Sequence, residues 1–211
     1  LTAFTVIGSL LELPFDLYGT FVLEQRFGFN RTTPWLYAVD LVKGTLLGAA
    51  TPASAALKVG DAAPDFTAPA TLGGKEFTFH LKDALRHGPV VVYFYPAAFT
   101  KGCTIEAHDF AQAMPDFRAA GASVIGVSHD DIATLNKFSV SECQSKFPVA
   151  ADRDRNIMKS YDAALGFLTP YADRTSYVVT GEGRIALVYS SLNPDKHVAG
   201  ALKAVRALKA N

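Results

Sequence analysis

From residue 57 onward, the sequence predicts an α/β domain built around a buried sheet. Two continuous apolar runs, VVVYFY at 90–95 and ASVIGVS at 122–128, are rich in β-branched and aromatic residues. Such runs are typical of strands that are covered on both faces. The stretch between them has helical spacing, so the three elements predict a right-handed βαβ unit. With 211 residues, the chain is long enough for one well-buried domain and an extra segment.

The next elements continue the alternation of helix and strand. Residues 131–147 predict a second helix, because apolar side chains recur on one side of it. RTSYVVT at 174–180 and RIALVYS at 184–190 are joined by the turn residues Gly181-Glu182-Gly183. Two β-rich runs around such a turn predict an antiparallel hairpin.

A closing helix completes the domain. Pro194 marks its start, and an amphipathic pattern continues from His197 to Ala210. The order strand, helix, strand, helix, hairpin, helix predicts a thioredoxin-like fold, in which a central mixed sheet is flanked by helices.

Residues 1–50 form an extra apolar N-terminal segment of different composition. Leu1–Leu13 is too short to span a bilayer, and Asp40 and Lys43 interrupt the second apolar run at 35–50. Neither run alone predicts a transmembrane helix. The chain begins with Leu rather than Met, so we expect a fragment or a processed chain.

The block LPFDLYGTFVLEQRFGFNRTTP at 13–34 resembles the amino-terminal part of membrane-bound CaaX prenyl proteases of the M48 family, and the resemblance extends over about residues 1–48. The zinc motif His-Glu-x-x-His of that family is absent from the sequence. We therefore expect no protease activity, although this segment offers a membrane contact.

Residues 51–56 join the two parts and admit two interpretations. The pattern Ala53-Ser54-Ala55 is typical of a signal-peptide cleavage site, but an Ala-rich linker explains it equally well. The compartment therefore stays open between bacterial periplasm and cytoplasm, with membrane association through residues 1–50 as a further option.

The composition excludes several classes of function. Lys+Arg and Asp+Glu both number 20, so the formal net charge is zero. The charge balance therefore gives no reason to expect nucleic acid as a partner. Two cysteines cannot build a disulfide framework or a four-cysteine zinc site. The five histidines show no metal-ligand spacing, and we expect no metal or other cofactor.

The segment YPAAFTKGCTIEAHDF at 95–110 carries the candidate chemistry. Cys103 falls in the first turn of a helix that follows a buried strand, where free backbone N–H groups favour a thiolate. The Thr100 hydroxyl is expected to hydrogen-bond the sulfur and an oxygen of a bound substrate. Gly102 permits close approach at the turn, and Pro96 shields the sulfur from water.

The spacing Pro96-x-x-x-Thr100-x-x-Cys103, followed by Glu106, resembles the active-site motif of the peroxiredoxin family. GDAAPDF at 60–66 resembles the usual opening of that family, and Arg174 matches its late arginine. Within the family, residues 57–211 are most similar to the bacterioferritin-comigratory, or peroxiredoxin Q, branch. The resemblance implies that Cys103 attacks peroxide while Arg174 stabilises the developing negative charge.

Many members of this branch carry a resolving cysteine five residues after the first, where this chain has His108. The remaining candidate is Cys143, which we expect near the end of the second helix and, given its polar neighbours, within reach of solvent. Either Cys143 resolves the sulfenic acid within one chain, or Cys103 works alone with an external thiol. Both interpretations stay open here.

The resemblance implies a thioredoxin-dependent peroxidase that reduces hydrogen peroxide and small organic hydroperoxides, with a monomer as the expected state. A disulfide oxidoreductase is disfavoured, because position 100 is Thr where that chemistry needs a second Cys. The alternative is a membrane-associated thiol redox sensor or holdase of the same fold. Fast turnover with a reductant would favour the enzyme over the sensor.

Overall fold

The computed structural model describes residues 56–166 and 169–210. The apolar segment 1–50 and the Ala53-Ser54-Ala55 pattern lie outside the described residues. From Ala55 onward the chain folds as one unit. Within the described part of the chain, no helix is long and apolar enough to cross a membrane.

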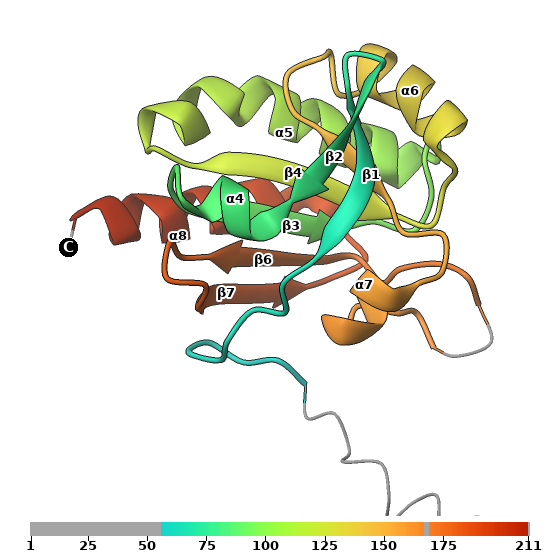
Figure 1. The fold of residues 1–211 in the computed structure, drawn as a ribbon. Coiled ribbons are helices and arrows are strands. Elements are labelled where there is room, and N and C mark those ends of the chain that lie inside the picture. The colour runs from blue at the N-terminus through green and yellow to red at the C-terminus, as the bar shows by residue number, and fades with distance from the viewer. Residues whose placement is uncertain (1–55, 167–168, 211) are drawn as a thin grey trace, which may run out of the picture. The chain divides into compact units, whose positions relative to one another are not determined.

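A seven-stranded mixed sheet forms the centre of this unit, in the order β2-β1-β5-β4-β3-β6-β7 (Figure 1). The strands are β1 Thr67–Leu72, β2 Lys75–His80, β3 Val90–Phe94, β4 Ser123–Ser128, β5 Val149–Ala151, β6 Thr175–Val179 and β7 Ile185–Ser190. β3 pairs in parallel with β4 and antiparallel with β6. The parallel pair confirms the predicted βαβ unit, and the β6–β7 pair confirms the predicted hairpin.

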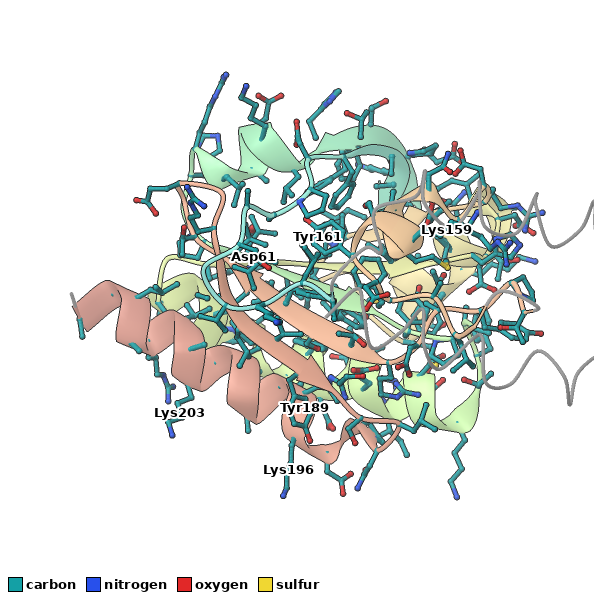
Figure 2. All side chains as sticks on the ribbon, turned by 90° about the horizontal axis from the view of Figure 1, so that it is seen from below. Asp61, Lys159, Tyr161, Tyr189, Lys196 and Lys203 are labelled. Carbon is teal, nitrogen blue, oxygen red and sulfur yellow. The ribbon has the colours of Figure 1, made fainter. Side chains whose placement is uncertain are left out.

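Helices cover both faces of the sheet (Figure 1). They are α4 Leu81–Leu85, α5 Lys101–Ala119, α6 Ile132–Ser141, α7 Asn156–Ser160, the 3-10 helix η2 Pro194–Lys196 and α8 His197–Ala210. α5, α6 and α8 pack on one face, and α4 and α7 pack on the other. Tyr161 lies inside the domain, whereas Lys196 and Lys203 extend away from it (Figure 2).

β3 occupies the middle of the sheet and explains its continuous apolar sequence. Val91 and Tyr93 face the α5 side, while Val92 and Phe94 face the α7 side, as the alternation of a strand requires. All five residues of β3 are buried. The strand therefore forms a rigid base for the loop that leaves its carboxyl end.

The predicted helix at 131–147 is shorter than expected. α6 starts after Asp131, whose Oδ1 accepts a hydrogen bond from the Thr134 N–H at 2.7 Å, and it ends at Ser141. Gln144 and Ser145 then adopt left-handed φ angles of 51° and 56°, which a continuing helix cannot contain. Cys143 therefore lies in the turn after α6 and not inside the helix.

Candidate active site

Cys103 lies in the first turn of α5, directly after the loop that leaves β3. Thr100 is the N-cap residue, so Cys103 is the third residue of the helix. Backbone N–H groups at this end have no partner within the helix, and their partial positive charge favours an anionic sulfur. The Cys103 side chain is nevertheless only 1% exposed, within the core between α5 and the sheet.

The half-buried carboxylate of Asp130 holds the loop before Cys103 in place. Asp130 Oδ2 accepts hydrogen bonds from the Ala98 N–H at 2.7 Å and from Ser128 Oγ at 2.8 Å. Phe99 next to it has a left-handed φ of 62°, and its ring packs edge-on against Phe138. This role could not be predicted from the sequence, because Ala98 and Asp130 lie 32 positions apart.

Arg174, which directly precedes β6, contacts Cys103 although the two residues lie 71 positions apart in the sequence. Its Nη2 lies 3.5 Å from the Cys103 Sγ, Nη1 forms an ion pair with Glu106 Oε2, and Nε donates to the Leu192 carbonyl at 3.0 Å. A side-chain carbon at Gly102 would lie 3.0 Å from Nη2, so the glycine leaves room for the guanidinium. Cys103, Glu106 and Arg174, predicted from distant positions, therefore meet in one buried site.

The charges in this site depend on one another. Burial raises the pKa of Glu106 to about 7, although the Arg174 guanidinium acts in the opposite direction. Burial alone would lower the pKa of Arg174, but the neighbouring Glu106 carboxylate and Cys103 sulfur raise it above its ordinary value. Arg174 is therefore a permanent cation, and the protonation of Glu106 decides how much of its charge is already neutralised.

Thr100 and Pro96 lie at the mouth of the site. The Thr100 hydroxyl donates to the Ala97 carbonyl at 3.0 Å, so the expected hydrogen bond to the Cys103 sulfur is not the one observed. The Thr100 O–H group is used in the bond to the Ala97 carbonyl, but the lone pairs of its oxygen can still accept hydrogen bonds. The Thr100 side chain is also exposed. Pro96 is half-buried at the start of the same loop.

A second buried group, His197 at the start of α8, was not identified from the sequence. Its Nδ1 lies 3.6 Å from Glu106 Oε1 and 2.8 Å from Ser176 Oγ. The sequence pattern shows only scattered histidines. The contact exists because α8 packs back against α5, and a local pattern cannot reveal such packing.

Cys143 is buried, so the expectation that solvent reaches it was wrong for the reduced protein. Its side chain is 0% exposed, although Glu142 and Gln144 beside it are half-buried and Ser145 is exposed. Burial raises the pKa of the Cys143 thiol far above its ordinary value, and the nearby Glu142 raises it further. Cys143 is therefore a neutral thiol in this state.

Both free cysteines belong to the same part of the core. Burial raises the pKa values of Tyr93 and Tyr95, and both cysteine sulfurs add to this rise. Both tyrosines and both cysteines belong to one cluster of buried residues. The rings of Tyr93 and Tyr95 stack on each other at 5.4 Å, and neither hydroxyl has a hydrogen-bond partner.

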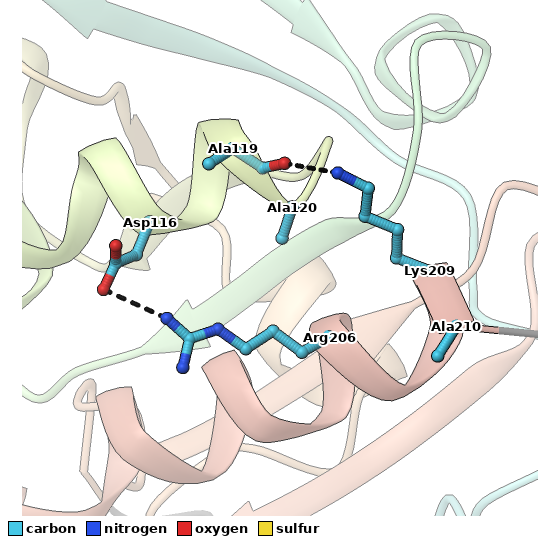
Figure 3. A pocket seen from close by; sticks show the side chains of 6 residues that line it. All are labelled: Asp116, Ala119, Ala120, Arg206, Lys209 and Ala210. Atoms are coloured by element: carbon cyan, nitrogen blue, oxygen red, sulfur yellow. Dashed lines mark hydrogen bonds and ion pairs between the residues drawn. The ribbon is translucent and has the colours of Figure 1, made fainter.

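The hollow shown in Figure 3 lies at the opposite end of α5 from Cys103. There Arg206 pairs with Asp116 at 3.2 Å, and Lys209 Nζ donates to the Ala119 carbonyl at 2.7 Å. These contacts fasten α8 to α5 and carry no reactive group. Among the described residues, no cluster of three His, Cys, Asp or Glu could hold a metal ion.

Two family models match different parts of this chain. Residues 59–188 match the model of the AhpC/TSA family. Residues 1–59 match the model of the CAAX prenyl protease N-terminal region, described as five membrane helices. The amino-terminal resemblance predicted from the sequence is thus confirmed.

The most similar relatives are peroxiredoxins. The chloroplastic peroxiredoxin Q of Oryza sativa is 33% identical over 150 residues, which cover 71% of this chain and 67% of that one. A Mycobacterium tuberculosis protein named as a peroxiredoxin is 35% identical over 148 residues, which cover 68% and 91%.

A solved structure supports the same assignment. The crystal structure of the peroxidoxin BcpB from Mycobacterium tuberculosis matches with a TM-score of 0.66 and 31% identity, covering 72% of this chain and 98% of that one. These matches confirm the predicted thioredoxin-like fold. The chain belongs to the AhpC/TSA family, and its relatives within that family make it a peroxiredoxin, a thiol-dependent peroxidase.

Proposed function

We propose that Cys103 is the peroxidatic residue. Its thiolate attacks the terminal peroxide oxygen, an S–O bond forms as the O–O bond breaks, and the departing oxygen takes a proton to give water or an alcohol. The observation that carries this proposal is the 3.5 Å contact between Arg174 Nη2 and the Cys103 sulfur at the N-terminus of α5. A fixed cation there stabilises both the thiolate and the charge that develops on the leaving oxygen.

Thr100, Pro96 and Glu106 have supporting roles in this proposal. The Thr100 hydroxyl already donates to Ala97, so its oxygen is ready to accept a hydrogen bond from the peroxide O–H. Pro96 restricts the loop and keeps water from the sulfur. Glu106 orients the guanidinium of Arg174 through their ion pair.

Cys143 is our candidate for the resolving cysteine. Its thiol would attack the Cys103 sulfenic acid, form the disulfide and release water. The presence of both cysteines in one core cluster with Tyr93 and Tyr95 supports this role. Because Cys143 is buried and a disulfide needs Cα atoms within about 7 Å, the turn after α6 must move.

The cycle closes when a dithiol reductant of the thioredoxin type reduces the disulfide, and it requires only one chain. The substrates are hydrogen peroxide and small organic hydroperoxides. Steady-state peroxide consumption with thioredoxin and its reductase tests this proposal. Wild type and the control Ser123→Ala, a change at an exposed serine of β4, should turn over. Cys103→Ser should be inactive, and Cys143→Ser should lose thioredoxin-driven turnover but keep a first oxidation. Turnover by Cys103→Ser would refute the proposal.

A further inference from the structure

His197 is buried and its ring tautomer follows from its partners. Its side chain is 0% exposed, and Nε2 lies 2.8 Å from the Ser191 carbonyl oxygen. Because a carbonyl oxygen only accepts hydrogen bonds, Nε2 carries a proton. In neutral His197, Nδ1 is then unprotonated and accepts a hydrogen bond from Ser176 Oγ at 2.8 Å.

Glu106 faces this same nitrogen with a carboxylate oxygen that has no partner. Glu106 Oε1 lies 3.6 Å from His197 Nδ1 and makes no hydrogen bond, whereas Oε2 is held by Arg174. If Glu106 is ionised and His197 neutral, two acceptors face each other in a fully buried site, which is unfavourable. One added proton converts the contact into an attraction.

We propose that His197 is a positioning residue for peroxide reduction. It shares one exchangeable proton with Glu106, and that proton sets how strongly Glu106 binds Arg174 beside Cys103. With the proton present, the charge of Arg174 is available to the Cys103 sulfur. With the proton lost, the Glu106 carboxylate neutralises much of that charge. This inference rests on the proposed role of Cys103 as the attacking residue.

The surrounding groups place the exchange near neutral pH. Burial lowers the pKa of His197, with Arg174 lowering it and Asp173 raising it, while burial raises the pKa of Glu106 to about 7, with Asp109 adding to the rise. The proton therefore resides on the Glu106 carboxyl, and His197 stays neutral.

Two further neighbours complete the surroundings of His197. Tyr189 of β7, which is labelled in Figure 2, packs edge-on against the His197 ring with centroids 4.7 Å apart. Ser176 of β6 contributes only a neutral hydroxyl. Neither group supplies a charge that would hold a proton on His197. The charged and titratable groups around Glu106 and His197 are therefore Arg174, Asp173, Asp109 and the Cys103 sulfur.

The test compares the pH dependence of the second-order rate with hydrogen peroxide in the full chain. His197→Asn places an amide N–H near Glu106 Oε1, and this donor favours the ionised carboxylate, so Glu106 stays ionised to a lower pH than in wild type. We expect this variant to match wild type at about pH 8 and to be about tenfold slower at about pH 6, since the lost proton amounts to about one unit charge near the sulfur. His87→Asn, the same change at an exposed histidine, should follow wild type throughout.

A constant ratio of variant to wild-type rates at all pH values would overturn the proposal, because a structural role alone predicts it. If His197→Asn fails to fold, ring ¹⁵N NMR of wild type decides. The proposal requires the Nε2–H tautomer of His197 and a change in its shifts between about pH 6 and about pH 8. An imidazolium, or no response to pH, refutes it. A failure of the proposed function would give a different result, namely peroxide turnover by Cys103→Ser.

Discussion

Replacing Gly102 by Ala tests whether Arg174 must lie against the Cys103 sulfur. A carbon at this position would lie 3.0 Å from Arg174 Nη2, so the guanidinium must yield by a few tenths of an ångström. It is tied to Glu106 and to the Leu192 carbonyl, so it cannot shift without weakening its 3.5 Å contact with Sγ. The substitution therefore acts on this one contact.

The magnitude follows from the type of contact that is lost. A hydrogen bond to a charged group contributes about 1.5–3 kcal/mol, and partial loss corresponds to the lower end. We expect Gly102→Ala to react with hydrogen peroxide about tenfold more slowly in stopped-flow measurements. The free energy of unfolding should rise by about 0.5–1 kcal/mol, because Ala favours a helix over Gly.

Gly200→Ala is the matched control. Gly200 lies in α8, and a carbon there would meet only Leu187 Cδ2 at 4.0 Å, an ordinary contact. This variant should gain similar stability with an unchanged rate. A Gly102→Ala variant as fast as wild type would refute the argument that the Arg174–Cys103 contact drives the reaction.

Three further predictions follow from other contacts. Asp130→Ala should lower the free energy of unfolding, measured in urea, by about 1–3 kcal/mol and should slow peroxide reduction, because the Ala98 N–H loses its hydrogen-bond partner. Unchanged values of both quantities would contradict this expectation. Because burial raises the pKa of Glu106, its contribution to the free energy of unfolding is full below pH 4.5 and is lost as the pH rises to about 7. Wild type should therefore lose more stability than Glu106→Gln across that window. Parallel stability curves for the two proteins would contradict this expectation. His108→Ala removes the 3.1 Å pair with Glu142, which lies beside Cys143. Disulfide formation after peroxide addition should then accelerate about two- to fivefold, as measured by quenched-flow mass spectrometry. An unchanged rate would show that this pair does not restrain the turn.

The sequence analysis predicted β3, β4, β6 and β7 and missed β1, β2 and β5. β5 is buried, but its three residues are too few to show a pattern. VVVYFY and ASVIGVS stand out because every side chain in them is apolar or small. β1 and β2 were missed, since β1 contains Pro69 and five of the six β2 side chains are exposed. Gly73 and Gly74, both with positive φ, form the turn between them and were the available signal.

The active site was predictable where it is local and hidden where it depends on packing. Cys103 and its helix follow from one continuous segment. The contacts of Asp130 with Ala98 and of His197 with Glu106 join distant segments, and no spacing rule encodes them. The polar neighbours of Cys143 indicated exposure, but the turn after α6 directs the thiol inward, because Gln144 and Ser145 reverse the chain there.

Intact mass after one equivalent of hydrogen peroxide, without added thiol, tests the central claim most directly. Wild type should lose two hydrogens within one chain as Cys103 and Cys143 form a disulfide, Cys143→Ser should gain oxygen, and Cys103→Ser should remain unchanged. Gain of oxygen by wild type would show that Cys143 does not resolve the sulfenic acid. Oxidation of Cys103→Ser at the rate of wild type would contradict the assignment of Cys103 as the residue that attacks peroxide.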